Sequence, residues 1–164
     1  MRAPSLYNHF ESKDALYAAV LERGVGPVLE LLAQVAAQPG AVDRRRIVTE
    51  VMATLARHPN LARLLQHETL AGGRRLTPIL ERFIGPAFAR AEELIAADPN
   101  ARRWSAEQIP HLVLALYHIV VGYFAIADLY GDVRGEDLLA APALERQTRF
   151  LHQLVSTLFP DPSA

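Results

Sequence analysis

The chain has 164 residues, of which 51% are hydrophobic and 21% are charged, and its net charge is −1. This length suits one domain with a single core, and the apolar content excludes a disordered chain. The near-neutral charge provides no general basic surface for nucleic acid, and the absence of cysteine excludes disulfides and thiolate metal sites.

The N-terminal sequence predicts neither a signal peptide nor a membrane anchor. Met1 leads directly into a polar segment, without an apolar core for secretion. The longest apolar run, Leu112 to Ala127, is interrupted by His118 and is shorter than the roughly 20 residues that span a bilayer. We therefore expect a cytoplasmic protein that makes no contact with membranes.

Residues 2–16 predict a short helix, a break and the start of a second helix. Pro4 suits the first turn of the short helix, because its missing N–H needs no partner there. Ser12 is a typical N-cap for a helix that begins at Lys13. Lys13, the only lysine of the chain, lies where the helix dipole disfavours a cation, unless an anion such as a phosphate is close.

The segment Leu6-Tyr7-Asn8-His9-Phe10, followed by Lys13 and Leu16, resembles the signature of the TetR/AcrR family of bacterial transcriptional repressors. The resemblance implies an all-α protein, in which a TetR-like helical ligand-binding and dimerisation domain follows a truncated helix-turn-helix. Residues 1–23 would be the remnant of the DNA-binding domain, comprising the recognition helix and the next helix. Residues 27–160 would be the C-terminal ligand-binding and dimerisation domain.

The same resemblance assigns DNA contacts to the N-terminal residues. Arg2 and Ser5 would face base edges. The DNA backbone would be contacted by Tyr7, Asn8, His9 and Lys13. The family's DNA-binding head has three helices, and the first two would lie upstream of this motif. Because a recognition helix needs that scaffold in the major groove, we expect the chain as written not to bind operator DNA usefully.

Helical periodicity continues through the middle of the chain, without the alternation typical of strands. The sequence Gly24-Val25-Gly26-Pro27 predicts a break between two helices. The resemblance implies instead that the two pieces often form one long helix from head to body, in which a kink at this point could act as a hinge. Asp43 predicts the N-cap of the next helix, whose first turn, Arg44 to Arg46, is expected to be solvated. Pro59 is expected to end that helix and Asn60 to cap the following one.

A long helix is predicted from Thr77-Pro78, and its inward side is expected to carry Ile79, Leu80, Phe83, Ile84, Ala87, Phe88, Ala91, Leu94 and Ile95. The pair Gly85-Pro86 interrupts it, either as a kink that fits the curvature of the fold or as a bend that opens a cavity.

Two further helices are predicted at the C-terminal end. Ser105 would cap a helix from Ala106 to about Tyr130, and the last helix would begin within 138–142. The first is apolar on every side, which a small monomer cannot bury, so we expect a homodimer joined by a four-helix bundle. The expected interface residues are Ala115, Gly122, Ala125, Leu144, Leu151, Val155 and Leu158.

No motif of catalysis is present: GxSxG, a glycine-rich phosphate loop and HExxH are all missing. We therefore expect neither an enzyme nor a cofactor. His111 and His118 share a helix face, and with His67 and Glu68 they could hold a metal ion. Histidines on apolar helices are more often hydrogen-bonded core or interface residues, so no metal site is predicted.

A pocket for an organic molecule is the favoured interpretation, because helical bundles hold ligands between their helices. Glu68 lies on the apolar stripe of Leu61, Leu64 and Leu65, where a carboxylate needs a partner. The expected ligand-binding residues are His67, Glu68, Phe83, Phe88, Trp104, Tyr117, His118, Tyr123 and Phe124.

The sequence as a whole therefore predicts a TetR-like regulator, a repressor that releases operator DNA when a small hydrophobic or amphipathic effector binds. The alternative is a head-less helical dimer that acts as a small-molecule sensor or interaction module.

Overall fold

The computed structural model describes residues 10–37, 43–70 and 77–160, and every regular element in these ranges is helical. The predicted all-α class is therefore confirmed for the described chain. The elements are α1 (Lys13–Ala36), α2 (Arg44–Arg57), α3 (Pro59–Leu70), α4 (Thr77–Ala97), the short 3₁₀ helix η2 (Pro99–Ala101), α5 (Ile109–Ala125), α6 (Ala127–Arg134) and α7 (Ala141–Leu158).

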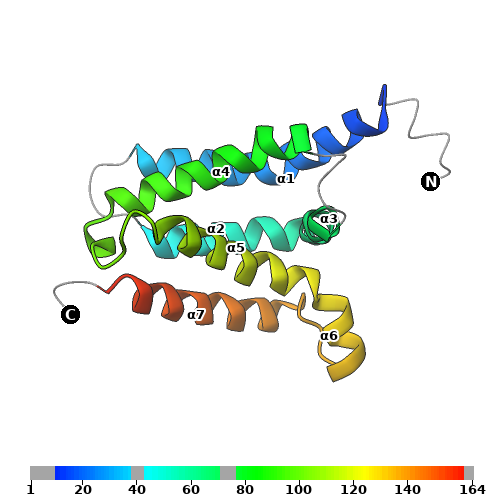
Figure 1. Cartoon of the computed structure of the whole chain (residues 1–164). Helices are drawn as coiled ribbons and strands as arrows, with labels where there is room; N and C mark the ends of the chain where they lie inside the picture. The colour runs from blue at the N-terminus through cyan, green and yellow to red at the C-terminus, as the bar shows by residue number, and fades with distance from the viewer. Residues whose placement is uncertain (1–9, 38–42, 71–76, 161–164) are drawn as a thin grey trace.

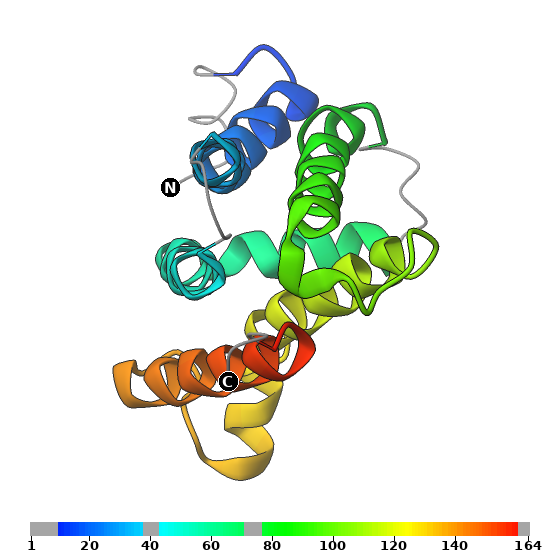
Figure 2. The ribbon, with the colours of Figure 1, turned by 90° about the vertical axis from the view of Figure 1, so that its left-hand side faces the viewer.

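The helices form three layers, which Figures 1 and 2 show from two sides. Helices α1 and α4 lie side by side in the upper layer of Figure 1. The middle layer holds α2, α3 and α5, and α7 packs below α2. The long helices of the upper layer therefore face the middle layer over most of their length.

The main core lies between α1, α2, α3, α5 and α7. Its three largest fully buried side chains are Leu21, Phe124 and Leu151, which come from α1, α5 and α7. Each side chain buried in this way contributes about 1.5–3 kcal/mol relative to an exposed one. This cluster holds the N-terminal half of α1 and the C-terminal helix in one folded unit.

Helix α1 begins where its sequence predicts and continues further than expected. The Ser12 hydroxyl accepts a hydrogen bond of 3.0 Å from the Ala15 N–H, which confirms the predicted N-cap. The predicted break at Gly24–Pro27 is wrong, since α1 runs through these residues to Ala36. Pro27 is exposed, so the helix accommodates the proline ring on its outer face. The expected boundary between residues 23 and 27 thus lies inside one helix.

Gly24 and Gly26 differ in what surrounds them. A Cβ at Gly24 would lie 2.5 Å from Leu61 Cδ2, whereas a Cβ at Gly26 would meet nothing within 4 Å. Gly24 therefore allows α1 to approach α3 closely. We expect Gly26→Ala to raise the free energy of unfolding by about 0.5–1 kcal/mol, and Gly24→Leu to lower it by about 1–3 kcal/mol through overpacking. Urea unfolding measures both, and equal effects would contradict this difference between the two glycines.

Two prolines begin helices that were predicted to start elsewhere. Pro59 is the first residue of α3, so Asn60 does not precede the helix as its cap. Pro110 lies in the first turn of α5, which begins at Ile109 and not at Ala106. Both corrections have one cause: proline lacks an N–H, and the first turn is where that donor has no helical partner. The Asp43 cap of α2 and the start of α7 near Pro142 are confirmed.

The predicted helix Ala106 to Tyr130 is two helices, α5 and α6, whose axes differ by 56°. No single helix among the described residues is long and apolar enough to cross a bilayer, and α5 with α6 meets that test only as this bent pair. In the single subunit, α5 is not buried on every side. Leu114 and Ile119 on its outer face are 43% and 36% exposed.

Candidate functional site

An apolar cavity of about 240 Å³ lies between the upper and middle layers. Five helices line it, from α1 to α5, and it is partly open to solvent. Its volume is close to the lower end of the range for small-molecule sites, about 300 Å³. The cavity is large enough for a compact organic molecule.

The walls of this cavity are almost entirely aliphatic. Helix α2 faces it with Ile47, Val48, Val51 and Leu55. The other helices contribute Gly24, Val25, Val28, Leu32, Leu61, Leu65, Ile84, Ala87, Phe88, Ala91, Ile95, Val113, Leu116, Tyr117, Val120 and Val121. The predicted inward face of α4 is confirmed for Ile84, Ala87, Phe88, Ala91 and Ile95, which line this cavity, and for Leu94, which is buried. The side chains of Ile79, Leu80 and Phe83 lie outside the described part of the structure.

Among the described residues that line the cavity, Tyr117 carries the one polar side chain. Its ring meets the ring of Phe88 edge to face, with centroids 5.2 Å apart and planes at 82°. Such edge-to-face pairs are favoured by the aromatic quadrupole and hold both rings in place. Phe88 and Tyr117, two of the residues expected from sequence, therefore form one aromatic corner between α4 and α5.

Burial raises the pKa of the Tyr117 phenol above its ordinary value of 10.0. The folded protein thus holds this proton more tightly than the unfolded chain, so the associated stability is complete below about pH 10 and is lost as the pH rises further. We expect the free energy of unfolding to fall above this pH, and Tyr117→Phe to reduce that fall. Urea unfolding at a series of alkaline pH values measures both slopes.

Few other groups interfere with this measurement, because Lys13 is the only lysine and arginine stays charged. Burial also raises the pKa of the Tyr123 phenol, which leaves a residual slope in the Tyr117→Phe variant. An unchanged slope in that variant would show that Tyr117 titrates as an exposed phenol.

Three of the expected aromatic residues lie elsewhere. Phe124 is fully buried in the main core. The Tyr123 hydroxyl donates a hydrogen bond of 2.8 Å to the Leu138 carbonyl, and the Trp104 indole N–H donates one of 3.0 Å to the Leu158 carbonyl. These two hydrogen bonds hold the chain just before α7 and at the last residue of α7. Tyr123 and Trp104 therefore connect parts of the fold and do not line this cavity.

Two of the three expected polar contacts, His67 and His118, are not part of the described cavity wall. His67 and His118 are exposed, as is His111. The side chains of Glu68 and Phe83 lie outside the described part of the structure. Within the described residues, no three histidine, aspartate or glutamate side chains come together as ligands for a metal ion.

A second, smaller cavity of about 120 Å³ adjoins the first. The two share Leu32, Ile47, Ala91, Ile95 and Leu116 in their walls. The smaller cavity also has Phe159 and Val155 from the C-terminal end of the chain. The two spaces therefore lie next to each other between the Phe88 corner and the end of α7, and we refer to the pair of them as the hollow.

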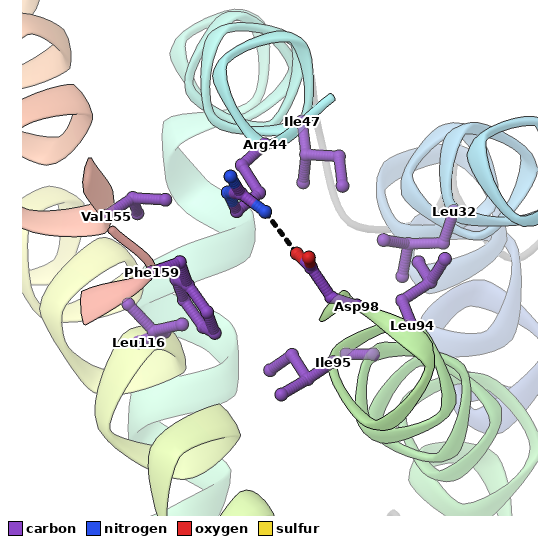
Figure 3. Close-up of a pocket in the computed structure, with 10 residues that line it drawn as sticks. Leu32, Arg44, Ile47, Leu94, Ile95, Asp98, Leu116, Val155 and Phe159 are labelled. Atoms are coloured by element: carbon purple, nitrogen blue, oxygen red, sulfur yellow. Dashed lines mark hydrogen bonds and ion pairs between the residues drawn. The ribbon is translucent and has the colours of Figure 1, made fainter. Parts of the chain in front are cut away.

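An ion pair between Arg44 and Asp98 lies at this far end of the hollow (Figure 3). The Asp98 side chain is 2% exposed and that of Arg44 21%. The Arg44 guanidinium also lies over the ring of Phe159, 5.6 Å from its centroid. The hollow therefore ends in a buried pair of opposite charges.

Sequence reasoning missed both charged residues. The arginines at the start of α2 were interpreted as a solvated turn, yet the side chain of Arg44 is largely covered. Its partner is 54 positions away, beyond any local pattern. The one available signal was Asp98-Pro99, because an aspartate before a proline is typical of a short helix start.

The residues expected at the dimer interface divide between interior and surface. Leu151 is 1% exposed and Val155 7% exposed, so both pack into the core of their own subunit. Leu144 and Leu158 are half-buried against the same core. Ala115 is exposed, whereas Gly122 and Ala125 are half-buried on α5.

The expected DNA contacts Arg2, Ser5, Tyr7, Asn8 and His9 lie outside the described residues, as does the side chain of Lys13. Comparison of the chain with protein-family models, with curated proteins and with solved structures gives no match. The features that bear on function are therefore the cavity, the exposed apolar surface and the N-terminal motif.

Proposed function

We propose that this chain is the sensing body of a TetR-like transcriptional regulator, which binds a small apolar or amphipathic effector. The observation that carries the proposal is the hollow, about 240 Å³ in its main part, with Tyr117 as the one polar residue of its described wall apart from the terminal ion pair. Well-packed domains contain few voids larger than a water molecule, so an apolar space of this size favours a ligand site.

Helix α1 supports a regulatory role because it connects the N-terminal motif to the hollow. Its first residue, Lys13, belongs to the motif, and Val25, Val28 and Leu32 of the same helix line the cavity. A rigid helix transmits a displacement along its length without an intervening hinge. In the proposed mechanism, ligand binding shifts α1 and thereby the DNA-binding head, provided that the ligand prefers one of the two positions.

The outer face of α5 supports a homodimer. Leu114, Ala115, His118 and Ile119 are exposed there, and a Cβ added at Gly122 would meet nothing within 4 Å. Exposed apolar side chains at helical spacing with a small residue among them allow close approach of a second helix. In this proposal the α5 helices of two subunits pair across a two-fold axis, where each residue meets its own copy or a neighbour.

We expect Ile119→Arg to weaken the dimer by at least about tenfold, because the two-fold axis brings the new charges together on a desolvated apolar surface. Sedimentation velocity over a range of protein concentrations measures the shift from dimer to monomer. Leu70→Arg on α3 is the matched control, since Leu70 is 80% exposed. Identical sedimentation of wild type and Ile119→Arg would contradict the proposed α5 interface.

The second candidate function is a helical sensor or interaction module without DNA binding. It is favoured by apolar residues on α6, where Leu129 is 60% and Val133 72% exposed. These residues lie beyond α5 and offer a surface for a different protein.

Selection of DNA from a random pool tests the choice between the two functions. From this pool, the 164-residue chain is expected to enrich no particular DNA sequence. A protein expressed from a longer reading frame, with about forty further residues that end in a helix-turn pattern, is expected to retain one. Retention by the 164-residue chain, or by neither protein, would contradict the regulator proposal as stated.

A further inference from the structure

The Arg44–Asp98 pair is asymmetric in how firmly each charge is held. Asp98 is the N-cap of η2, and its Oδ1 accepts a hydrogen bond of 2.9 Å from the Asn100 N–H. Its own N–H donates to the Ile95 carbonyl at 3.1 Å, so both its backbone and its carboxylate are fixed. Arg44 is the first residue of α2, and its long side chain is one-fifth exposed. The negative charge is therefore anchored, whereas the positive charge can move to solvent.

This asymmetry determines which ligand charge the hollow tolerates. A ligand cation that replaces the Arg44 guanidinium keeps Asp98 paired, and Arg44 regains its hydration outside. A ligand anion that takes Arg44 would remove the only charged partner the structure gives the Asp98 carboxylate. A buried carboxylate without a partner is costly, so exchange of the cation is the favourable route.

The ring of Phe159 offers the incoming cation a second contact. It already lies under the Arg44 guanidinium at 5.6 Å. Ammonium groups bind the face of an aromatic ring in the same way, and more strongly where water is excluded. Figure 3 shows Phe159 and Leu116 on one side of the ion pair and Leu94 and Ile95 on the other. The charged end of the hollow therefore combines one fixed carboxylate with one aromatic face.

We propose that the effector is an organic cation, whose apolar body occupies the main cavity and whose protonated amine replaces the Arg44 guanidinium at Asp98. This inference rests on the proposed function, because it names the ligand of the same hollow. It also supplies a signal: Arg44 ties the start of α2 to the end of α4, and its displacement releases that tie.

A matched set of ligands tests the proposal: octylammonium, octanol and octanoate, which share one alkyl chain and differ in charge. Each is titrated against N-phenyl-1-naphthylamine, an uncharged fluorescent probe of apolar sites, bound to the wild-type protein. We expect octylammonium to displace the probe at least about tenfold more effectively than octanoate, with octanol between them. Tightest binding of octanoate would overturn the proposal.

Two variants separate this inference from the proposed function. Asp98→Asn keeps an oxygen that can accept from the Asn100 N–H, and it is expected to weaken octylammonium by about tenfold while octanol is unchanged. Arg44→Gln removes the competing cation and is expected to strengthen octylammonium, which provides a test if Asp98→Asn does not fold. Equal binding of all three ligands overturns the charge inference and leaves the proposed function standing. Failure of every ligand and of the probe to bind overturns both.

Discussion

Phe124→Ala is expected to lower the free energy of unfolding by about 3–5 kcal/mol. Phe124 is 0% exposed, packs in the cluster with Leu21 and Leu151, and meets the ring of Tyr123 edge to face at 5.5 Å. Removal of its ring leaves a void in the main core. Guanidinium unfolding followed by far-ultraviolet circular dichroism measures the loss.

Phe150→Ala is the matched control, because Phe150 is 51% exposed on α7. Its effect on the free energy of unfolding is expected to stay within about 0.5 kcal/mol. From the sequence, Phe124 was expected to contact a ligand, whereas in the structure its side chain is buried in the main core. A Phe124→Ala variant of wild-type stability with impaired binding of the naphthylamine probe would favour the interpretation from sequence.

Ala91→Phe is expected to abolish binding of the naphthylamine probe. Ala91 lies on α4 and lines both cavities, so a ring at this position projects into the middle of the hollow. The existing space receives the ring, and the cost to stability is therefore expected to remain below the 1–3 kcal/mol typical of overpacking a filled core. Fluorescence titration measures the probe affinity, and urea unfolding measures the stability.

Ala89→Phe provides the control for this second prediction, since Ala89 is an exposed alanine on the same helix. It is expected to bind the probe as wild type does. Probe affinity that is equal in wild type, Ala91→Phe and Ala89→Phe would show that the probe binds outside the hollow.

Local features of the fold were predictable because their causes lie within a few residues. Ser12 and Asp43 are short polar side chains immediately before apolar stripes, and both cap their helices as expected. The inward face of α4 follows from its helical period, and Ala87 and Ala91 lie where that period predicts. Prolines were harder to interpret, because Pro59 was expected to end one helix and begins the next, whereas Pro110 was expected inside a helix and lies in its first turn.

The site was predictable only in part. Phe88 and Tyr117 were expected because aromatic residues stand out on apolar helices. The aliphatic wall residues of α1 and α2, such as Val28 and Ile47, cannot be told apart from ordinary core residues in the sequence. The sequence does not show where packing leaves a void. The Arg44–Asp98 pair joins residues far apart in sequence, and only the folded chain brings them together.

The two histidines that were expected to contact the ligand, His67 and His118, do not line the described cavity. His118 lies on the apolar helix α5 and was expected to face a ligand, yet it is exposed on the outer face. The apolar sequence of α5 does not show which side of the helix faces the core of its own subunit. His118 lies on the side that is uncovered in one subunit.

The claim on which the proposed function depends is that a small molecule binds inside the hollow between α1, α2, α4 and α5. Methyl NMR of the 164-residue protein during titration with N-phenyl-1-naphthylamine tests it most directly. We predict saturable shifts and intermolecular contacts at the methyl groups of Val28, Ile47 and Ile84, and none at Leu129 on α6. Shifts confined to Leu129 and other exposed methyl groups, with Val28, Ile47 and Ile84 unchanged, would contradict the account.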